Sequence, residues 1–97
     1  MAVVEVVTFR LAADVEQGDF LVADKRAQTE FLYMQTGLLR RTTARGMEGE
    51  WLVVTLWATG RDADTAALSA RDDPAASLLT SLMDPSSITS NRYDTLE

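Results

Sequence analysis

The chain has 97 residues, and its 9 Lys and Arg against 15 Asp and Glu give a formal net charge of −6. It contains no histidine and no cysteine, which excludes His-ligated and thiolate metal sites, cysteine nucleophiles, Ser-His-Asp triads and disulfide frameworks. The acidic balance argues against nucleic acid as a partner, because binding to a polyanion depends on clustered Lys and Arg.

Length and composition favour one globular domain over residues 1–97. Hydrophobic residues make up 46% of the chain and charged residues 25%, which is typical of a folded protein rather than a disordered one. A domain of this size buries only about 60 to 70% of its unfolded surface, so a partner subunit would add useful burial. No apolar run approaches the ~18 residues of a membrane span, and the opening residues carry no basic leader. We therefore expect a cytoplasmic domain with no membrane partner.

The first third of the chain predicts a strand followed by a helix. Residues 3–11 are rich in valine and apolar on both faces, which indicates a central strand covered on two sides. We expect Asp19 to cap the helix, and Gly37, in a left-handed conformation, to end it near Gln35. The apolar stripe of this helix has spacings of three and four and consists of Phe20, Ala23, Ala27, Phe31 and Met34.

A hairpin of two strands is predicted next. Residues 38–46 carry Arg40 on one face and Arg41 with Arg45 on the other, and this pattern suits an edge strand that its charges protect from aggregation. Residues 50–58 place Trp51, Val53, Thr55 and Trp57 on one face and Leu52, Val54 and Leu56 on the other. This segment is therefore predicted to be a second central strand.

The last third predicts a broken helix and a final strand. Asp62 and Asp64 favour a helix start, Arg71 closes its first piece, and Asp73-Pro74 restarts it with a cap and a proline at the first position. The apolar stripe of the second piece is Leu78, Leu79, Leu82 and Met83, ended by Asp84-Pro85. Residues 88–96 are mostly polar and predict an edge strand.

The predicted order is β-α-β-β-α-β, which defines an α+β, ferredoxin-like βαββαβ fold with a four-stranded antiparallel sheet and two helices on one face. Right-handed crossovers place the first and third strands at the centre, where the two-sided apolar pattern also places them. Two helices on one side cannot cover both faces of the sheet. A second copy of the chain is the economical cover for the other face, so we expect a homodimer that forms a dimeric α+β barrel.

Several short motifs point to a known family. They are Gly37-Leu38-Leu39 after the first helix, Gly49 in the hairpin, Trp57 at the end of the third strand, the alanine-rich helix and Asp73-Pro74. Over nearly its whole length the chain resembles the dimeric α+β barrels of the antibiotic biosynthesis monooxygenase superfamily. The resemblance implies two protomers that pack their sheets together, with a small-molecule cleft between sheet and helices in each.

Members of that superfamily include oxygenases that use neither metal nor flavin, and relatives that degrade haem. The haem-degrading pattern has an Asn on the first strand, a Trp on the third and a His on the second helix. Trp57 matches the Trp, but the Asn position falls near Val7 or Thr8 and the chain has no His. Axial ligation of haem by His is impossible here, and the sequence argues against haem degradation.

The predicted cleft takes a small apolar or aromatic molecule. Its expected lining is Trp57, Phe9, Phe20, Phe31, Leu82 and Met83. Trp57 is the best single candidate for a wall, because an indole offers a flat apolar face and one N–H donor. The alternative is that these side chains simply close into a core and leave no volume for a ligand.

No catalytic residue can be assigned from the sequence. Glu5 lies among apolar side chains and is a candidate proton acceptor, but an ion pair with Arg41 or Arg92 on a neighbouring strand is the commoner outcome. The three arginines of residues 38–46 fit an anionic ligand or, more commonly, a solvated edge.

Two functional hypotheses follow. The first is a dimeric barrel that binds a small apolar or aromatic molecule, and the alternative is a cofactor-independent monooxygenase. In either case we expect no metal and no flavin, because the chain lacks His, Cys and a phosphate-cradling glycine motif.

Overall fold

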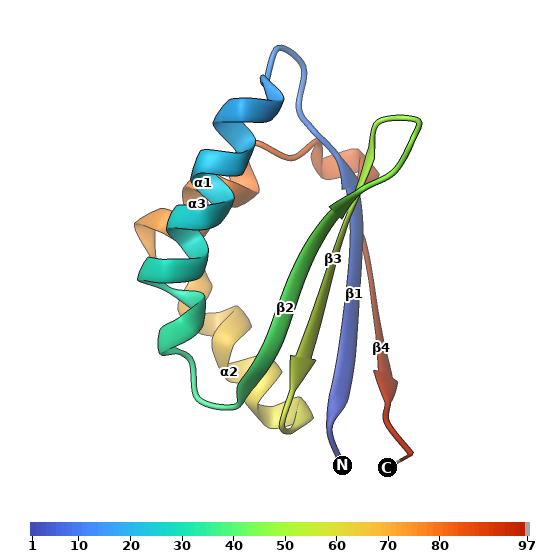
Figure 1. Ribbon diagram of the computed structural model, residues 1–97. Coiled ribbons are helices and arrows are strands. Elements are labelled where there is room, and N and C mark those ends of the chain that lie inside the picture. The colour runs from blue at the N-terminus through green and yellow to red at the C-terminus, as the bar shows by residue number, and fades with distance from the viewer. Residues whose placement is uncertain (97) are drawn as a thin grey trace.

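The computed structural model describes residues 1–96, and in this range the chain forms one sheet and a layer of helices beside it (Figure 1). The strands are β1 (Val3–Arg10), β2 (Leu38–Arg45), β3 (Glu50–Trp57) and β4 (Thr89–Asp94). The α-helices are α1 (Gln17–Glu30), α2 (Gly60–Ala70) and α3 (Pro74–Ser81), with short 3-10 helices η1 (Leu32–Met34) and η2 (Pro85–Ser87). The predicted α+β fold is confirmed.

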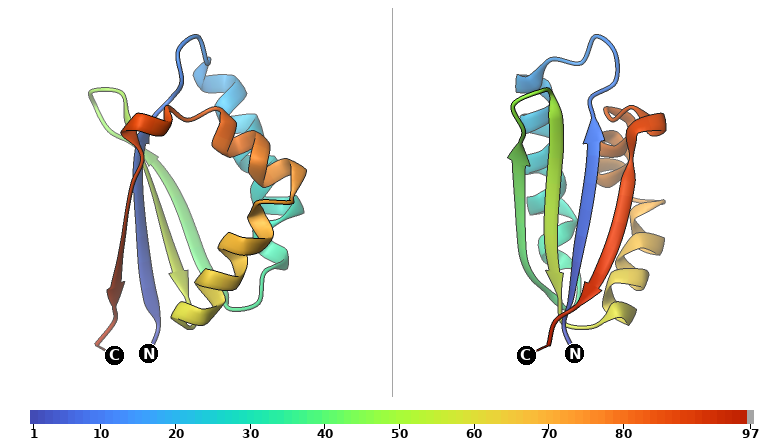
Figure 2. Two further views of the ribbon diagram at one scale, coloured as in Figure 1. Left: turned by 180° about the vertical axis from the view of Figure 1, so that it is seen from behind. Right: turned by 90° about the vertical axis from the view of Figure 1, so that its right-hand side faces the viewer.

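The sheet has the order β2-β3-β1-β4, and every neighbouring pair is antiparallel (Figure 2). The two strands with apolar residues on both faces, β1 and β3, are central, as their sequences predict. The arginine-bearing β2 and the polar β4 form the edges, where charged and polar side chains oppose pairing with another chain.

The first helix differs from its prediction at both ends. Its N-cap is Glu16, which makes no side-chain cap hydrogen bond, so Asp19 lies in the first turn and not at the cap. There its carboxylate is favoured by the helix dipole instead. At the other end the helix stops at Glu30, because the backbone of Phe31 leaves the helical conformation with φ −128° and ψ −61°.

This early end removes Met34 from the apolar stripe. The chain continues through η1, and Met34 is 74% exposed, so its predicted place on the buried stripe is wrong. The other members of the stripe, Phe20, Ala23, Ala27 and Phe31, are buried. Gly37 takes the left-handed conformation, with φ +84°, in the turn into β2.

The broken second helix is confirmed. The side chain of Thr59 caps α2 by accepting from the Asp62 N–H at 3.1 Å, and the Asp73 carboxylate caps α3 by accepting from the Ala76 N–H at 2.9 Å. Pro74 occupies the first turn of α3. Backbone N–H groups at this position have no acceptor within the helix, so a proline there costs no hydrogen bond. Of the predicted stripe on this piece, Leu79 is buried while Leu78 is 42% exposed.

The core between sheet and helices is divided into two clusters. The larger cluster is at the hairpin end of the sheet and contains Phe9, Phe20, Ala23, Ala27, Trp51, Val53, Ala75 and Leu79. The smaller one groups Trp57 with Ala63 and Ala66 of α2. The helix side of both clusters is rich in alanine, and small side chains there leave room opposite the large residues of the sheet.

The far face of the sheet has no α-helix over it, since α1, α2 and α3 lie on the other side (Figures 1 and 2). On β3 the residues of the helix-facing side are buried, while those of the far side are only half-buried. Within the same range, no helix has the length and apolarity needed to cross a bilayer.

Candidate functional site

A cavity of about 190 Å³ lies between the sheet and the helices, at the seam of the two core clusters. On the helix side it is bordered by the small side chains of Ala27, Ala70 and Ala76. Its large apolar lining residues are Val7, Phe9, Phe31, Leu32, Val53, Trp57, Leu79 and Met83. The lining is therefore mostly hydrocarbon and aromatic, as in most ligand pockets.

Four of the six residues predicted to line a cleft meet at this cavity, namely Phe9, Phe31, Trp57 and Met83. Phe20 lies instead at the centre of the larger cluster, with its ring 5.6 Å from that of Phe9 and 4.8 Å from that of Trp51. Phe20 lies seven residues before the cavity-lining Ala27, which is roughly 10 Å along a helix axis. Leu82 packs against the same larger cluster.

A row of polar side chains crosses the sheet at the level of the cavity. Glu5 on β1 is paired with Thr55 on β3, and Thr55 is paired with Arg41 on β2. On the other side Glu5 is paired with Arg92 on β4, so the row runs across all four strands as Arg92, Glu5, Thr55 and Arg41. Glu5, Thr55 and Arg41 all line the cavity.

Arg41 is the most deeply buried charge of the row. Its side chain is only 4% exposed, and its Nη2 donates to Asp24 Oδ1 of α1 at 2.7 Å. Its Nη1 donates to Gln28 Oε1 at 3.2 Å and to Thr43 Oγ1 at 3.3 Å, while the Thr43 hydroxyl donates to Asp24 Oδ2 at 2.9 Å. The hypothesis of a solvated arginine edge is therefore wrong for Arg41, which joins the edge strand to α1.

One feature of the sequence indicates the ion pair between Asp24 and Arg41. Asp24 lies four residues after Phe20 and three before Ala27, on the buried face of α1, where only 8% of it is exposed. A carboxylate at a buried helix position is rarely left without a cation partner. Choosing Arg41 as that partner required the helix-to-sheet packing, which the sequence pattern does not contain.

Glu5 forms the predicted ion pair with Arg92, whose Nε lies 3.1 Å from Glu5 Oε2. Arg92 Nη1 also donates to Asp64 Oδ1 of α2 at 2.6 Å. The hydrogen bond with Asp64, and secondarily that with Glu5, raises the pKa of Arg92 above its ordinary value. Glu5 remains part of the cavity wall and is half-buried, so its carboxylate is the acceptor available there.

Trp57 supplies a donor to the same site. The residue is 3% exposed, and among residues 1–96 its indole Nε1–H has no hydrogen-bond acceptor. A buried donor without an acceptor is costly and therefore rare, and ligand sites are among the places where such donors persist. Within the described part of the chain, no group of three or more acidic side chains is placed to hold a metal ion.

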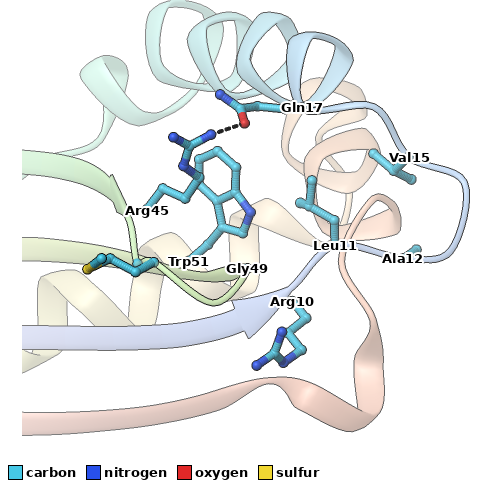
Figure 3. Close-up of a pocket in the computed structure, with 10 residues that line it drawn as sticks. Arg10, Leu11, Ala12, Val15, Gln17, Arg45, Gly49 and Trp51 are labelled. Atoms are coloured by element: carbon cyan, nitrogen blue, oxygen red, sulfur yellow. Dashed lines mark hydrogen bonds between the residues drawn. The ribbon is translucent and has the colours of Figure 1, made fainter.

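A larger hollow of about 650 Å³ lies at the hairpin end, between the β2–β3 turn and the segment that joins β1 to α1 (Figure 3). Arg45 lies beside the indole of Trp51 there and donates to Gln17 in the first turn of α1 (Figure 3). The rim of this hollow is formed by exposed side chains such as Met47. We place the candidate site in the smaller cavity because it lies between the two layers, has an apolar lining and contains the buried polar groups.

Comparisons with known proteins place the fold. No family model matches the chain, and no curated protein matches its sequence. Among solved structures, SnoaB, a cofactor-independent oxygenase from Streptomyces nogalater, superposes with a TM-score of 0.79 at 17% identity, over 99% of this chain and 94% of its own. An antibiotic biosynthesis monooxygenase-like protein from Caulobacter crescentus gives a TM-score of 0.80 at 15% identity, over 99% and 91%.

A conserved protein from Methanosarcina mazei is also similar, with a TM-score of 0.77 at 16% identity, over 96% of this chain and 91% of its own. Each superposition extends over almost the full length of both chains, so the similarity concerns the whole fold. The chain has the ferredoxin-like fold of the antibiotic biosynthesis monooxygenase-like proteins, as the resemblance of its motifs predicts.

The Asp24–Arg41 pair generates the first testable prediction. Replacing Asp24 by Ala leaves a guanidinium buried without its counter-charge, and we expect a loss of about 3 to 5 kcal/mol in the free energy of unfolding. Glu30→Ala is the matched control, because it removes another arginine-paired carboxylate of α1 whose side chain is 55% exposed. That exposed pair is worth at most about 1 kcal/mol. Urea denaturation at one protein concentration measures the free energy of unfolding of both variants. Equally small losses in the two variants would contradict the conclusion that the buried ion pair stabilises the fold more than the exposed one.

Proposed function

We propose that this protein is a homodimer in which each protomer binds a small aromatic or comparably small apolar molecule in the cavity between sheet and helices. The observation that carries the proposal is the polar row of Glu5, Thr55 and Arg41 along one wall of an otherwise apolar cavity. Ligand pockets characteristically combine an apolar lining with a few placed polar groups that orient the ligand.

The size of the cavity suits a small ligand. An engineered cavity of about 150 Å³ in another protein accepts benzene, and the cavity here measures about 190 Å³. A molecule of one ring with one or two substituents therefore fits without movement of the walls. The faces of Phe9, Phe31 and Trp57 offer such a ring the offset or edge-to-face contacts that aromatic groups prefer.

The homodimer is supported by the uncovered far face of the sheet. Its central strands present Val4, Val6, Leu52, Val54 and Leu56, all half-buried, and the helices leave this face bare. A contiguous apolar surface of this kind on a small domain usually marks an interface. A second copy of the same sheet supplies a complementary surface by two-fold symmetry.

A second candidate function is a cofactor-independent monooxygenase, and Glu5 is the observation that favours it. A reaction of this kind needs a group that accepts a proton from the aromatic substrate before oxygen attacks the ring. One oxygen atom of O2 enters the ring, and the other leaves as water with two hydrogens and two electrons from the substrate itself. In a chain without histidine, a carboxylate that faces the cavity fills this role.

Uptake of dissolved oxygen in the presence of a bound phenol distinguishes the oxygenase from a binding protein. The Glu5→Gln variant should abolish oxygen uptake while phenol binding persists.

Filling the cavity tests the ligand site. Ala76→Leu adds three carbon atoms at a half-buried position of the cavity wall, and we expect binding of phenol to fall below detection while the fold is kept. Ala67→Leu adds the same atoms at an exposed position of α2 and should leave binding unchanged. Ligand titrations followed by NMR give both affinities. Undiminished binding in the Ala76 variant would exclude the cavity as the site.

Charging the far face tests the dimer. Val54→Asp places a carboxylate in the middle of the proposed interface, where it would be desolvated, and we expect dissociation to monomers or unfolding. Val22→Asp on α1 is the control, since that side chain is 71% exposed on the helix layer. Analytical ultracentrifugation should find a dimer for the natural chain and the control. A natural chain that stays monomeric across micromolar concentrations would refute the dimer.

A further inference from the structure

Arg41 has hydrogen-bonding capacity that the protein does not use. A guanidinium carries five N–H donors, and the contacts with Asp24, Gln28 and Thr43 occupy three of them. Among residues 1–96, no acceptor is placed for Nε–H or for the second N–H of Nη2. The side chain is 4% exposed and belongs to a residue that lines the cavity.

A second unused donor lies close to the first. Trp57 follows Thr55 by two residues on β3, so it is the diagonal cross-strand neighbour of Arg41 on the same face of the sheet. Diagonal neighbours are separated by roughly 7 to 8 Å between their Cα atoms. The indole N–H of Trp57 has no acceptor in the described chain either. This end of the cavity therefore has an excess of N–H donors over acceptors.

The one carboxylate among the lining residues lies at the other end of the cavity, while the Asp24 carboxylate contacts Arg41 from α1. Glu5 is two strands away from Arg41, which is roughly 10 Å between Cα atoms at the usual strand spacing, and its carboxylate already accepts from Arg92. A ligand anion beside Arg41 thus meets two free N–H donors of a guanidinium whose other side is paired with Asp24, while Glu5 is distant and paired. The space between them lies over Thr55 and has aromatic walls.

We propose that the ligand class of the cavity is a small aromatic carboxylate whose carboxylate group binds Arg41. A guanidinium matches a carboxylate in planarity and charge and commonly binds it through two parallel N–H···O bonds. The ring then extends along the row toward Glu5, against Phe31 and Trp57. Asp24 and Gln28 hold the guanidinium in place from α1, so the site is organised before a ligand enters. This inference rests on the proposed ligand-binding function.

Three probes of nearly equal shape test the charge preference on the unmodified protein. Benzoate, benzamide and benzamidine share one ring and differ in carrying an anionic, a neutral or a cationic group. At pH 7 we expect benzoate to bind about tenfold more tightly than benzamide, as charge-assisted hydrogen bonds to a buried donor imply, and benzamidine to bind most weakly. Benzamide binding as tightly as benzoate, or benzamidine binding most tightly, would overturn the carboxylate proposal.

Two variants test whether Arg41 causes the preference for benzoate over benzamide. In the double variant Asp24→Asn with Arg41→Gln, both buried charges are removed and hydrogen-bonding side chains remain, so no unpaired charge is left to unfold the chain. Its affinity for benzoate should fall about tenfold, so that benzoate loses its advantage over benzamide. Arg45→Gln is the control on the same strand and the same face, exposed at the open hollow, and it should change neither affinity. A loss of benzoate binding with Arg45→Gln and not with the double variant would refute the assignment.

The same titrations separate this inference from the function on which it rests. If none of the three probes binds at millimolar concentration, both the ligand site and its carboxylate preference are contradicted. If benzamide binds and benzoate has no advantage, the cavity remains a ligand site and only the carboxylate inference is refuted.

Discussion

The ion pair between Asp24 and Arg41 joins the helix layer to the edge of the sheet, and the cavity exists beside it. Both side chains are almost completely removed from water, with 11% and 4% of their surfaces exposed. Desolvating two charges costs several kcal/mol, and the cost is offset only when the remaining donors and acceptors are satisfied in good geometry. Thr43 and Gln28 satisfy two further N–H donors of Arg41, so α1 is held over β2 in a defined position and two donors are left over.

The register of the sheet turns this pair into part of a site. Because β1, β3 and β2 are antiparallel neighbours in one register, Glu5, Thr55 and Arg41 come from distant parts of the chain to a single line across the sheet. Alternation along each strand directs the three side chains to the helix-facing side. Facing them are alanines on α1, α2 and α3, whose short side chains leave the volume unfilled. The site therefore arises from long polar residues on the sheet opposite short residues on the helices.

Features that depend on local pattern were predictable. The two-sided apolar sequences of residues 3–11 and 50–58 predicted central strands, and the Asp73-Pro74 pair predicted the restart of the broken helix, because capping and burial leave signals within a few residues. The end of α1 was predicted near Gln35, five residues beyond its actual end at Glu30, since the pattern up to Met34 continues past the point where Phe31 leaves the helix.

Features that depend on how the layers meet were not predictable. The arginine pattern of β2 is the same for a solvated edge and for a buried ion pair, and only the position of α1 over the sheet decides that Arg41 is buried. The separation of Phe20 from Phe31 likewise depends on where the cavity falls along α1. Both residues share one apolar stripe, but Phe20 packs between Phe9 and Trp51, and Phe31 lines the cavity.

The central claim is that a ligand enters the cavity beside Trp57. The chain has two tryptophans, and each borders a different hollow, Trp57 the cavity between the layers and Trp51 the open hollow at the hairpin end. In a ¹H–¹⁵N spectrum, titration with benzoate should shift the indole N–H signal of Trp57, because the ring of the ligand packs against this indole, and leave that of Trp51 in place. A shift of the Trp51 signal alone, or of neither signal at saturating benzoate, would contradict the claim.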